Sequence, residues 1–360
     1  MRKILYSISL LFLVAMPAIS QIRFVDAKEL KLYGKLSDST ETRYERLPAK
    51  LKNKTRSPVW NLGKNTAGLF LRFSSNSSSI SLRWELKDNV VMDHMAFTGI
   101  KGFDLYCLND SGRWQFVSCA RPKGKLSETK IISNMPVKNR EFLLNFPLYD
   151  GVTDLQIGVD SLSVLSLPKN DEFADQKPII AYGTSILQGA CASRPGMAAT
   201  NILTRKLSRE VINLGFSGNG QLDYEIAEVM SERPAVLYLL DFVPNVNVKQ
   251  IEEKGEKFFR IIRDRNPQTP ILFIENPIFP HTLFDASLSD YVPAKNRALK
   301  ALFNQLQHSG EKNIYYLSSE DLLGTDQEAT VDGIHSTDLG FTRYVDVVCP
   351  LIHSILSKQQ

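Results

Sequence analysis

The sequence has few of the residues that build cysteine-rich or metal-stabilised domains. Among its 360 residues are four cysteines and five histidines. No two of the cysteines stand close enough along the chain to give the paired spacing of a zinc finger. We therefore expect no structural metal. We interpret the cysteines as small apolar side chains, and their spacing leaves any disulfide pairing open: Cys107, Cys119, Cys191 and Cys349.

The sequence also lacks a concentration of charge of one sign. Its 43 Lys and Arg residues nearly balance 39 Asp and Glu residues, which leaves a net charge of +4 spread along the chain. A groove for nucleic acid requires a cluster of basic residues, and none is present. We therefore expect no nucleic-acid partner. No stretch after residue 20 is apolar enough to suggest a membrane span.

Residues 1–20 have the pattern of a secretory signal peptide. Arg2 and Lys3 give a positive start, an apolar run follows over residues 4–16, and Ala18 and Ser20 offer small residues at a cleavage site. The alternative is a membrane anchor, but the run is short for a span. No cysteine follows it, so we expect no lipid attachment. We expect cleavage and export to the periplasm or the cell exterior, where disulfides can form.

Residues 21–170 have the pattern of an all-β domain. Alternating apolar and polar residues predict strands at 68–73, 79–84, 103–108, 113–117, 141–146 and 155–159. Polar turn clusters stand at 76–78 and 109–112, and the second predicts a hairpin. Many short strands without a long amphipathic helix predict a jelly-roll-like β-sandwich.

Residues 176–360, after a polar linker at 169–177, show a different pattern. Predicted strands at 178–182, 211–214, 235–240, 270–274 and 313–317 alternate with predicted helices at 197–207, 224–231, 248–265 and the C-terminus. This alternation predicts an α/β domain whose parallel sheet is covered on both faces. Two domains also agree with the length of the chain.

Reactive side chains follow the strands of this second domain. In a parallel sheet the carboxyl ends of the strands meet at one edge, where ligands bind. Ser185, Gly218 and Asn245 follow three of the strands, and Asp332 and His335 precede the closing helix. We therefore expect these five residues to lie together.

Such a set is suited to acyl transfer. A serine hydroxyl becomes a nucleophile when a base such as His335 takes its proton, and Asp332 can hold the histidine in the required tautomer. Preorganised N–H groups stabilise the oxyanion of the tetrahedral intermediate. Gly218 can bring its backbone N–H close, and Asn245 can supply a side-chain amide.

These residues resemble the sequence blocks of SGNH hydrolases. Gly183-Thr184-Ser185-Ile186 is similar to the first block, whose usual form is Gly-Asp-Ser, while Gly218 and Asn245 resemble the second and third blocks and Asp332-x-x-His335 resembles the fifth. The resemblance implies a flavodoxin-like, three-layer domain that works without a cofactor or metal. It also implies the roles of the residues: Ser185 as nucleophile, His335 as base, Asp332 as its orienting partner, and Ser185 N–H, Gly218 N–H and the Asn245 side chain as oxyanion donors. Thr184 departs from the usual Asp, so the hydrogen bonding of this loop is expected to differ.

The first half carries its own resemblance. Residues 102–106, Gly-Phe-Asp-Leu-Tyr, are similar to the Gly-x-Asp-Leu-Tyr motif of a β-domain that precedes GDSL-like hydrolases in two-domain bacterial proteins. A β-sandwich before an SGNH domain also resembles the architecture of carbohydrate acetylesterases. The resemblance implies a serine esterase that deacetylates carbohydrate. Two alternatives stay open: a lipid, aryl or thioester hydrolase, and a glycan-binding protein without catalysis.

Three residues have competing interpretations. Ser217 is a rival nucleophile, although Asn219 replaces the second glycine of a Gly-x-Ser-x-Gly elbow. His94 either lines the mouth of the active site from the β-domain or caps a hairpin. Glu275 follows a strand at the catalytic edge and is expected to position a loop.

Overall fold

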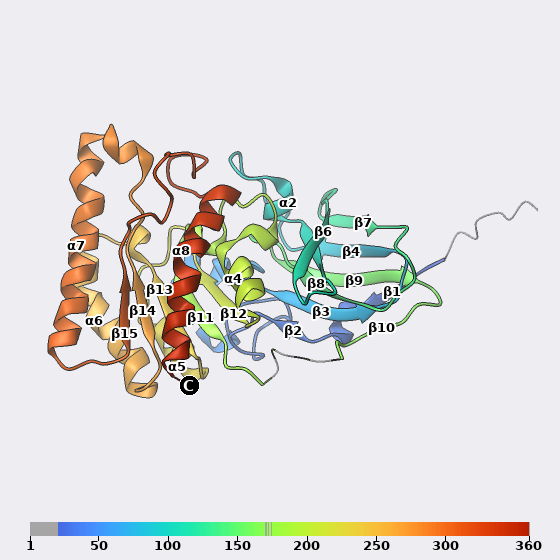
Figure 1. The fold of residues 1–360 in the computed structure, drawn as a ribbon, viewed down its shortest axis with the longest axis horizontal. Coiled ribbons are helices and arrows are strands. Elements are labelled where there is room, and N and C mark those ends of the chain that lie inside the picture. The colour runs from blue at the N-terminus through green and yellow to red at the C-terminus, as the bar shows by residue number, and fades with distance from the viewer. Residues whose placement is uncertain (1–20, 170, 172, 174, 360) are drawn as a thin grey trace, which may run out of the picture.

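The structure is a computed structural model that describes residues 21–169, 171, 173 and 175–359. The predicted signal peptide, residues 1–20, lies outside the described residues. The described chain forms two layered units that pack against each other, with a β-rich unit on one side and a mixed α/β unit on the other (Figure 1).

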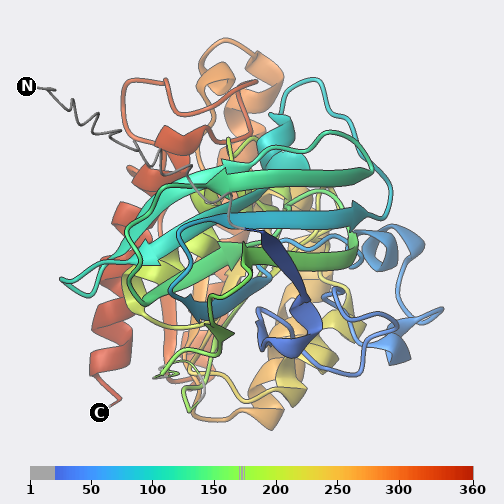
Figure 2. The ribbon, with the colours of Figure 1, turned by 90° about the vertical axis from the view of Figure 1, so that its right-hand side faces the viewer.

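The N-terminal unit is a sandwich of two antiparallel sheets (Figure 2). One sheet has the order β1 (Ile22–Asp26), β9 (Val152–Asp160), β4 (Ile80–Leu86) and β7 (Leu126–Ile132). The other has the order β10 (Leu165–Ser166), β3 (Phe70–Ser75), β8 (Arg140–Asn145), β5 (Phe103–Leu108) and β6 (Trp114–Ala120), with β2 (Leu32–Tyr33) added on β3. Short helices lie between the strands: η1 (Ala27–Glu29), η2 (Ala49–Leu51), α1 (Ser57–Leu62) and α2 (Phe97–Ile100).

The sandwich core follows from the alternation seen in the sequence. Phe73, Trp84, Leu105 and Phe142 point into one buried cluster between the two sheets, because successive side chains of a strand point to opposite faces. The predicted β-sandwich is confirmed. The turn at 76–78 joins strands of different sheets, so it carries the chain across the sandwich and forms no hairpin.

The C-terminal unit is built on a five-stranded parallel sheet. Its order is β12 (Val211–Gly215), β11 (Ile179–Gly183), β13 (Leu237–Asp241), β14 (Ile271–Ile274) and β15 (Ile314–Leu317). In the order of the domain's own strands this is 2-1-3-4-5, the flavodoxin-like arrangement. The helices are α3 (Ser185–Gln188), η3 (Pro195–Met197), α4 (Ala199–Leu207), α5 (Tyr224–Glu232), η4 (Val243–Asn245), α6 (Val248–Arg265), η5 (Pro280–Leu283), α7 (Ala286–His308) and α8 (Asp338–Ser357).

Helices cover both faces of this sheet. Leu203 of α4 and Val345 of α8 belong to one buried cluster, and Phe258 of α6 and Leu299 of α7 belong to another. The predicted three-layer fold is confirmed. Among the described helices, α8 alone is long and apolar enough to cross a membrane by length and composition. Here it packs on the sheet as a core helix.

Helix α7 is the main element that the sequence analysis did not predict. It is 23 residues long and contains Pro293. Proline removes a backbone donor and usually ends or bends a helix. The signal for one long helix is weakened by this residue, although Leu299, Leu302 and Leu306 beyond it are buried on one side.

The Gly-x-Asp-Leu-Tyr motif joins the two units. Asp104 is fully buried on β5. Its carboxylate accepts hydrogen bonds from Asn145 Nδ2 (2.8 Å), Arg194 Nη1 (2.8 Å) and the Gly196 N–H (2.8 Å). The Tyr106 hydroxyl accepts a second bond from Arg194 Nη1 at 2.5 Å. The motif therefore fixes the loop that follows the helix of Ser185.

A buried arginine forms a second joint. Arg46 donates to the carbonyl oxygens of Leu62 (2.6 Å) and Asn65 (2.9 Å) in its own unit. It also donates to those of Asn213 (3.0 Å) and Gly215 (2.8 Å) on β12. Burial lowers the pKa of this guanidinium to about 9, since charge is disfavoured away from water. Arg46 therefore anchors the end of β12 to the N-terminal unit.

Candidate active site

Ser185 stands where β11 turns into α3. Thr184 caps this short helix, because its Oγ1 accepts a hydrogen bond from the Ile186 N–H at 3.3 Å. The hydroxyl of Thr184 thus caps the helix at the position of the usual Asp. The Ser185 side chain lies in a nearly closed setting, with 6% of the residue exposed.

Ser185, His335 and Asp332 form a connected chain of hydrogen bonds. Ser185 Oγ lies 3.0 Å from His335 Nε2, and His335 Nδ1 lies 2.7 Å from Asp332 Oδ2. The other carboxylate oxygen accepts from the His335 N–H (2.8 Å) and the Ile334 N–H (3.0 Å). Burial alone would raise the pKa of Asp332, but its hydrogen bonds to His335 and Ile334 outweigh this effect and hold the pKa at about 2.

Gly218 and Asn245 lie on the loops that follow β12 and β13. Gly218 has φ +66°, a left-handed conformation that favours glycine, and a Cβ there would meet no atom within 4 Å. The side of Gly218 that a side chain would occupy is therefore open. Asn245 Oδ1 accepts from the Gly220 N–H at 3.2 Å. Within the described part of the chain no hydrogen bond uses Asn245 Nδ2, so this donor stays available.

A buried lysine supports the Asn245 loop, and sequence reasoning missed it. Lys295 of α7 is 3% exposed. Its ammonium donates to the carbonyl oxygens of Val243 (3.2 Å) and Pro244 (3.4 Å) and to Asn276 Oδ1 (3.0 Å). Burial lowers the pKa of Lys295 to about 8. Since these partners follow two different strands, β13 and β14, and Lys295 lies on α7, no local pattern could have indicated them.

Residues of the N-terminal unit also reach the strand ends. The Tyr149 hydroxyl donates to the Ser185 carbonyl oxygen at 3.3 Å. Gln188 Nε2 donates to the Leu148 carbonyl at 3.1 Å, and Gln188 Oε1 accepts from the Ser217 N–H at 3.0 Å. Ser217 thus takes part in shaping the loop before Gly218. Among the described residues, His335 makes its serine hydrogen bond to Ser185 and not to Ser217.

His94 reaches the catalytic histidine from the β-domain. Its ring centroid lies 5.5 Å from that of His335. The fully buried Asp150 holds the loop before His94, because it accepts from the Val90 N–H (2.7 Å) and the Asp88 N–H (3.0 Å). Of the two interpretations, a position at the mouth of the site fits this geometry.

Two further loops border the site. Glu275 accepts hydrogen bonds from the Ser319 N–H (2.7 Å) and from the Tyr316 hydroxyl, so it positions a loop as expected. The loop of His335 contains Gly333 at φ +88°, and a Cβ there would lie 2.7 Å from His281 Nδ1. The segment η5 therefore packs directly on the catalytic loop.

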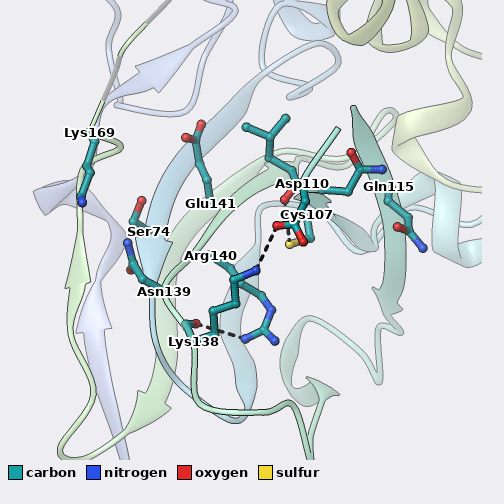
Figure 3. Close-up of a pocket in the computed structure, with 11 residues that line it drawn as sticks. Ser74, Cys107, Asp110, Gln115, Lys138, Asn139, Arg140, Glu141 and Lys169 are labelled. Carbon is teal, nitrogen blue, oxygen red and sulfur yellow. Dashed lines mark hydrogen bonds and ion pairs between the residues drawn. The ribbon is translucent and has the colours of Figure 1, made fainter. Parts of the chain in front are cut away.

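A separate polar cavity of about 450 Å³ lies on the β-domain (Figure 3). It is lined by residues of strands β3, β5, β6 and β8, of the turn after β5 and of the loop before β8, and by Lys169 of the linker. Lys138 and Asp110 form an ion pair at 2.9 Å beside it (Figure 3). No residue of the Ser185 site lines this cavity. All four cysteines are free thiols.

Comparisons with known proteins agree with this geometry. Residues 176–353 match the family model of the GDSL-like lipase/acylhydrolase family, and residues 22–165 match that of the N-terminus of SGNH-hydrolase-type esterases. A Bacteroides ovatus protein described as a GDSL-like lipase is 36% identical, with a TM-score of 0.90, over 94% of this chain and 98% of its own. No curated protein matches the sequence.

More distant structures share the fold. A salicylyl-acyltransferase from a tetracycline biosynthetic pathway is 17% identical, with a TM-score of 0.73, over 94% of this chain and 98% of its own. A family two carbohydrate esterase from Cellvibrio japonicus is 13% identical, with a TM-score of 0.60, over 94% of this chain and 99% of its own. On the family models and the Bacteroides ovatus relative, this chain belongs to the GDSL-like lipase/acylhydrolase family and is a hydrolase of the esterase type.

Proposed function

We propose that this protein is a serine esterase that removes acetyl groups from carbohydrate through an acyl-enzyme. The observation that carries the proposal is the continuous chain from Ser185 Oγ through His335 to Asp332, with hydrogen bonds of 3.0 and 2.7 Å. A serine so placed can lose its proton to the imidazole as it attacks a carbonyl.

In the first half of the reaction, Ser185 Oγ attacks the acetyl carbonyl carbon, and His335 Nε2 takes the hydroxyl proton. The oxyanion that forms is stabilised by the N–H groups of Ser185 and Gly218 and by Asn245 Nδ2. The bond to the sugar oxygen then breaks, and His335 returns its proton to that oxygen. Asp332 stabilises the imidazolium while the proton is held.

In the second half, water attacks the acetyl-serine. His335 takes a proton from the water, the same donors stabilise the second oxyanion, and the Ser185 oxygen leaves with the proton from His335. Acetate and free enzyme result. Every proton is accounted for by His335 and water, so these steps need no further group.

The carbohydrate assignment is supported by architecture. The family two carbohydrate esterase from Cellvibrio japonicus shares the fold across both units, at an identity that carries no residue-level argument. The polar cavity on the β-domain offers amides and charged groups of the kind that bind hydroxyl groups. Residues 1–20 have the pattern of a signal peptide, which supports export of the protein to a compartment where polymeric glycans are found.

One observation favours an ester with an apolar group as the second candidate. Leu283 and Phe284 are 67% and 90% exposed, and they adjoin His281, which packs against the loop of His335. Exposed apolar side chains beside a site are suited to contact with an apolar ligand. An aryl or lipid ester would use them, whereas an acetylated sugar would not need them.

The test is acetate release from acetylated xylan and from a panel of acetylated monosaccharides, with aryl esters of short and long acyl chains in parallel. We expect release by the wild type and a loss of about 10⁶-fold in Ser185→Ala. Ser217→Ala is the matched control and should retain activity. Turnover of aryl esters without acetate release from any glycan would favour the second candidate. Full activity in Ser185→Ala would refute the serine mechanism.

A further inference from the structure

One imidazole and one thiol lie close to the imidazole of the catalytic base, His335. The ligand atoms of His94, Cys191 and His335 all lie within 4.8 Å of one another. His94 comes from the β-domain and Cys191 from the turn after α3. The acyl-transfer steps use neither His94 nor Cys191, so the convergence calls for another explanation.

Both histidines are held in the way that metal-binding histidines usually are. His94 Nδ1 lies 3.1 Å from Asp93 Oδ1, and His335 Nδ1 lies 2.7 Å from Asp332 Oδ2. A carboxylate on Nδ1 fixes the tautomer and leaves Nε2 as the atom that can bind a metal. For His335, metal binding replaces the hydrogen bond between Nε2 and Ser185 Oγ. Two carboxylate-held imidazoles beside one thiol form a set that favours Zn²⁺ over Ca²⁺ or Mg²⁺.

Cys191 has the features of a held ligand. It is a free thiol, 7% exposed, with φ +70°. A left-handed conformation is unfavourable for a side chain larger than glycine, and such conformations concentrate at functional positions. The backbone at Ala192, which donates to the Gly189 carbonyl at 3.2 Å, fixes this turn.

We propose that His94, Cys191 and His335 bind a thiophilic divalent cation such as Zn²⁺, and that this binding switches the esterase off. The cation bonds to Nε2 of each histidine and to Sγ of Cys191, and the thiol proton leaves to water. His335 Nε2 can then no longer accept the proton of Ser185. No electron is transferred, so removal of the cation restores activity.

The geometry permits this with small movements. Tetrahedral zinc with bonds of about 2.0–2.3 Å needs donor atoms roughly 3.5 Å apart. None of the present separations is larger than 4.8 Å, so they need to shorten by about 1 Å, and the proposal requires side-chain rotation to supply this movement. Only the inhibition rests on the proposed esterase function. Binding of the cation can be measured without it.

The kinetic test is a Zn²⁺ titration of aryl-ester hydrolysis at fixed pH, with each variant scaled to its own metal-free rate. We expect inhibition of the wild type at micromolar Zn²⁺ and recovery with EDTA. Asp93→Asn should weaken inhibition by about tenfold, as for other outer partners of metal ligands. Cys191→Ser and His94→Gln should weaken it further. Cys119→Ser and His308→Ala, a thiol and an imidazole elsewhere, should respond as the wild type does.

The binding test uses the Ser185→Ala variant, because metal binding can be measured without esterase activity. Calorimetry should find one Zn²⁺ per chain, and Co²⁺ should give a thiolate charge-transfer band that Cys191→Ser abolishes. Absence of binding to Ser185→Ala and to the wild type overturns the proposal, as does equal inhibition of the wild type, Cys191→Ser and His94→Gln. A wild type without esterase activity that still binds Zn²⁺ would count against the proposed function and leave this site standing.

Discussion

Around Ser185 the polar side chains of the C-terminal unit hydrogen-bond to one another, whereas two buried charged side chains of the N-terminal unit bind groups of the other unit. Asp332 and His335 belong to the first group. Arg46 and Asp104 belong to the second, because their partners are carbonyls of β12 and groups of the 194–196 loop.

This difference separates residues that take part in the reaction from residues that hold the two units together. A group that meets the developing oxyanion lowers the barrier of the reaction, and its loss reduces rate without unfolding the protein. A buried charge that holds another segment contributes to the native state, and its loss leaves partners unsatisfied. Substitutions in the two groups should therefore have opposite signatures in rate and stability.

Of the substitutions that test this comparison, the largest effect is expected from Asn245→Ala. Removal of one oxyanion donor costs about 10²–10³-fold in kcat, or about 3–4 kcal/mol, in comparable sites. KM should change little, and stability should fall by only about 1 kcal/mol, because the variant loses the hydrogen bond from the Gly220 N–H to Asn245 Oδ1. Steady-state kinetics and a melting curve measure both. Asn304→Ala, on the exposed face of α7, is the control. A loss below threefold would exclude Asn245 from the oxyanion site.

Asp104→Ala should give the reverse signature. The change leaves the Arg194 guanidinium and the Gly196 N–H without their carboxylate, so we expect a loss of about 3 kcal/mol in stability. The remaining folded enzyme should keep its kcat within about tenfold. Urea unfolding beside activity measures this. Asp110→Ala breaks an exposed ion pair with Lys138 and should leave the unfolding midpoint unchanged. A large drop in kcat at unchanged stability would instead place Asp104 in the chemistry.

Asp241 tests the comparison from within the C-terminal unit, because it is a buried carboxyl group at a strand end that joins no catalytic chain. Burial raises its pKa to about 7, and the hydrogen bond from the Tyr344 hydroxyl at 2.9 Å offsets this only in part. The native state therefore holds a proton that the unfolded state releases near pH 4. Stability from this group is present below that pH and is lost as the pH rises toward 7.

We expect Asp241→Asn to remove the loss of stability that accompanies the rise in pH. At about 1.4 kcal/mol per pKa unit, the wild type should lose about 2–3 kcal/mol relative to the variant between pH 5 and pH 8. Thermal midpoints of both proteins at the two pH values give the difference. Asp264→Asn, at an exposed position of α6, serves as the control. Parallel curves for wild type and Asp241→Asn would show that Asp241 is ionised in the native state.

The strand-end residues could be predicted because their signals are local. A short apolar run followed by Gly-Thr-Ser indicates both a strand and the place where it ends. Asp and His three residues apart indicate a pair in one loop. The fold class followed from the same patterns. Spacing also placed Asp332 near His335 without any knowledge of the rest of the chain.

The supporting residues could not be predicted, because their partners are far away in sequence. Arg46 binds carbonyls more than 160 residues further along, and Asp104 binds a loop 90 residues away. A turn cluster such as 76–78 does not reveal whether the chain returns to the same sheet. His94 had two open interpretations since only the folded chain brings it to His335.

Lys295 belongs neither to the reacting residues nor to the residues that join the two units. Its substitution is expected to have the smallest effect of those that test the comparison. Lys295 lies within the C-terminal unit, yet like Arg46 it binds backbone carbonyls, here those of Val243 and Pro244 just before Asn245. No carboxylate lies within ion-pair distance of its ammonium among the described residues. The Tyr291 ring centroid is 5.2 Å away. We therefore expect Lys295 to act on the reaction through the position of Asn245.

We expect Lys295→Met to lower kcat by about tenfold, equal to about 1.4 kcal/mol, with KM unchanged. The substitution removes a buried charge but leaves Asn276 Oδ1 without its donor, so we expect stability to change by less than about 2 kcal/mol. The pKa of Lys295 is lowered to about 8, so the wild type should lose this contribution to kcat above pH 8, and the variant should lack that decline. Lys300→Met, exposed on the same helix, is the control. An unchanged pH profile in Lys295→Met would limit this lysine to packing, and the division between reacting and supporting residues would then not follow the boundary between the two units.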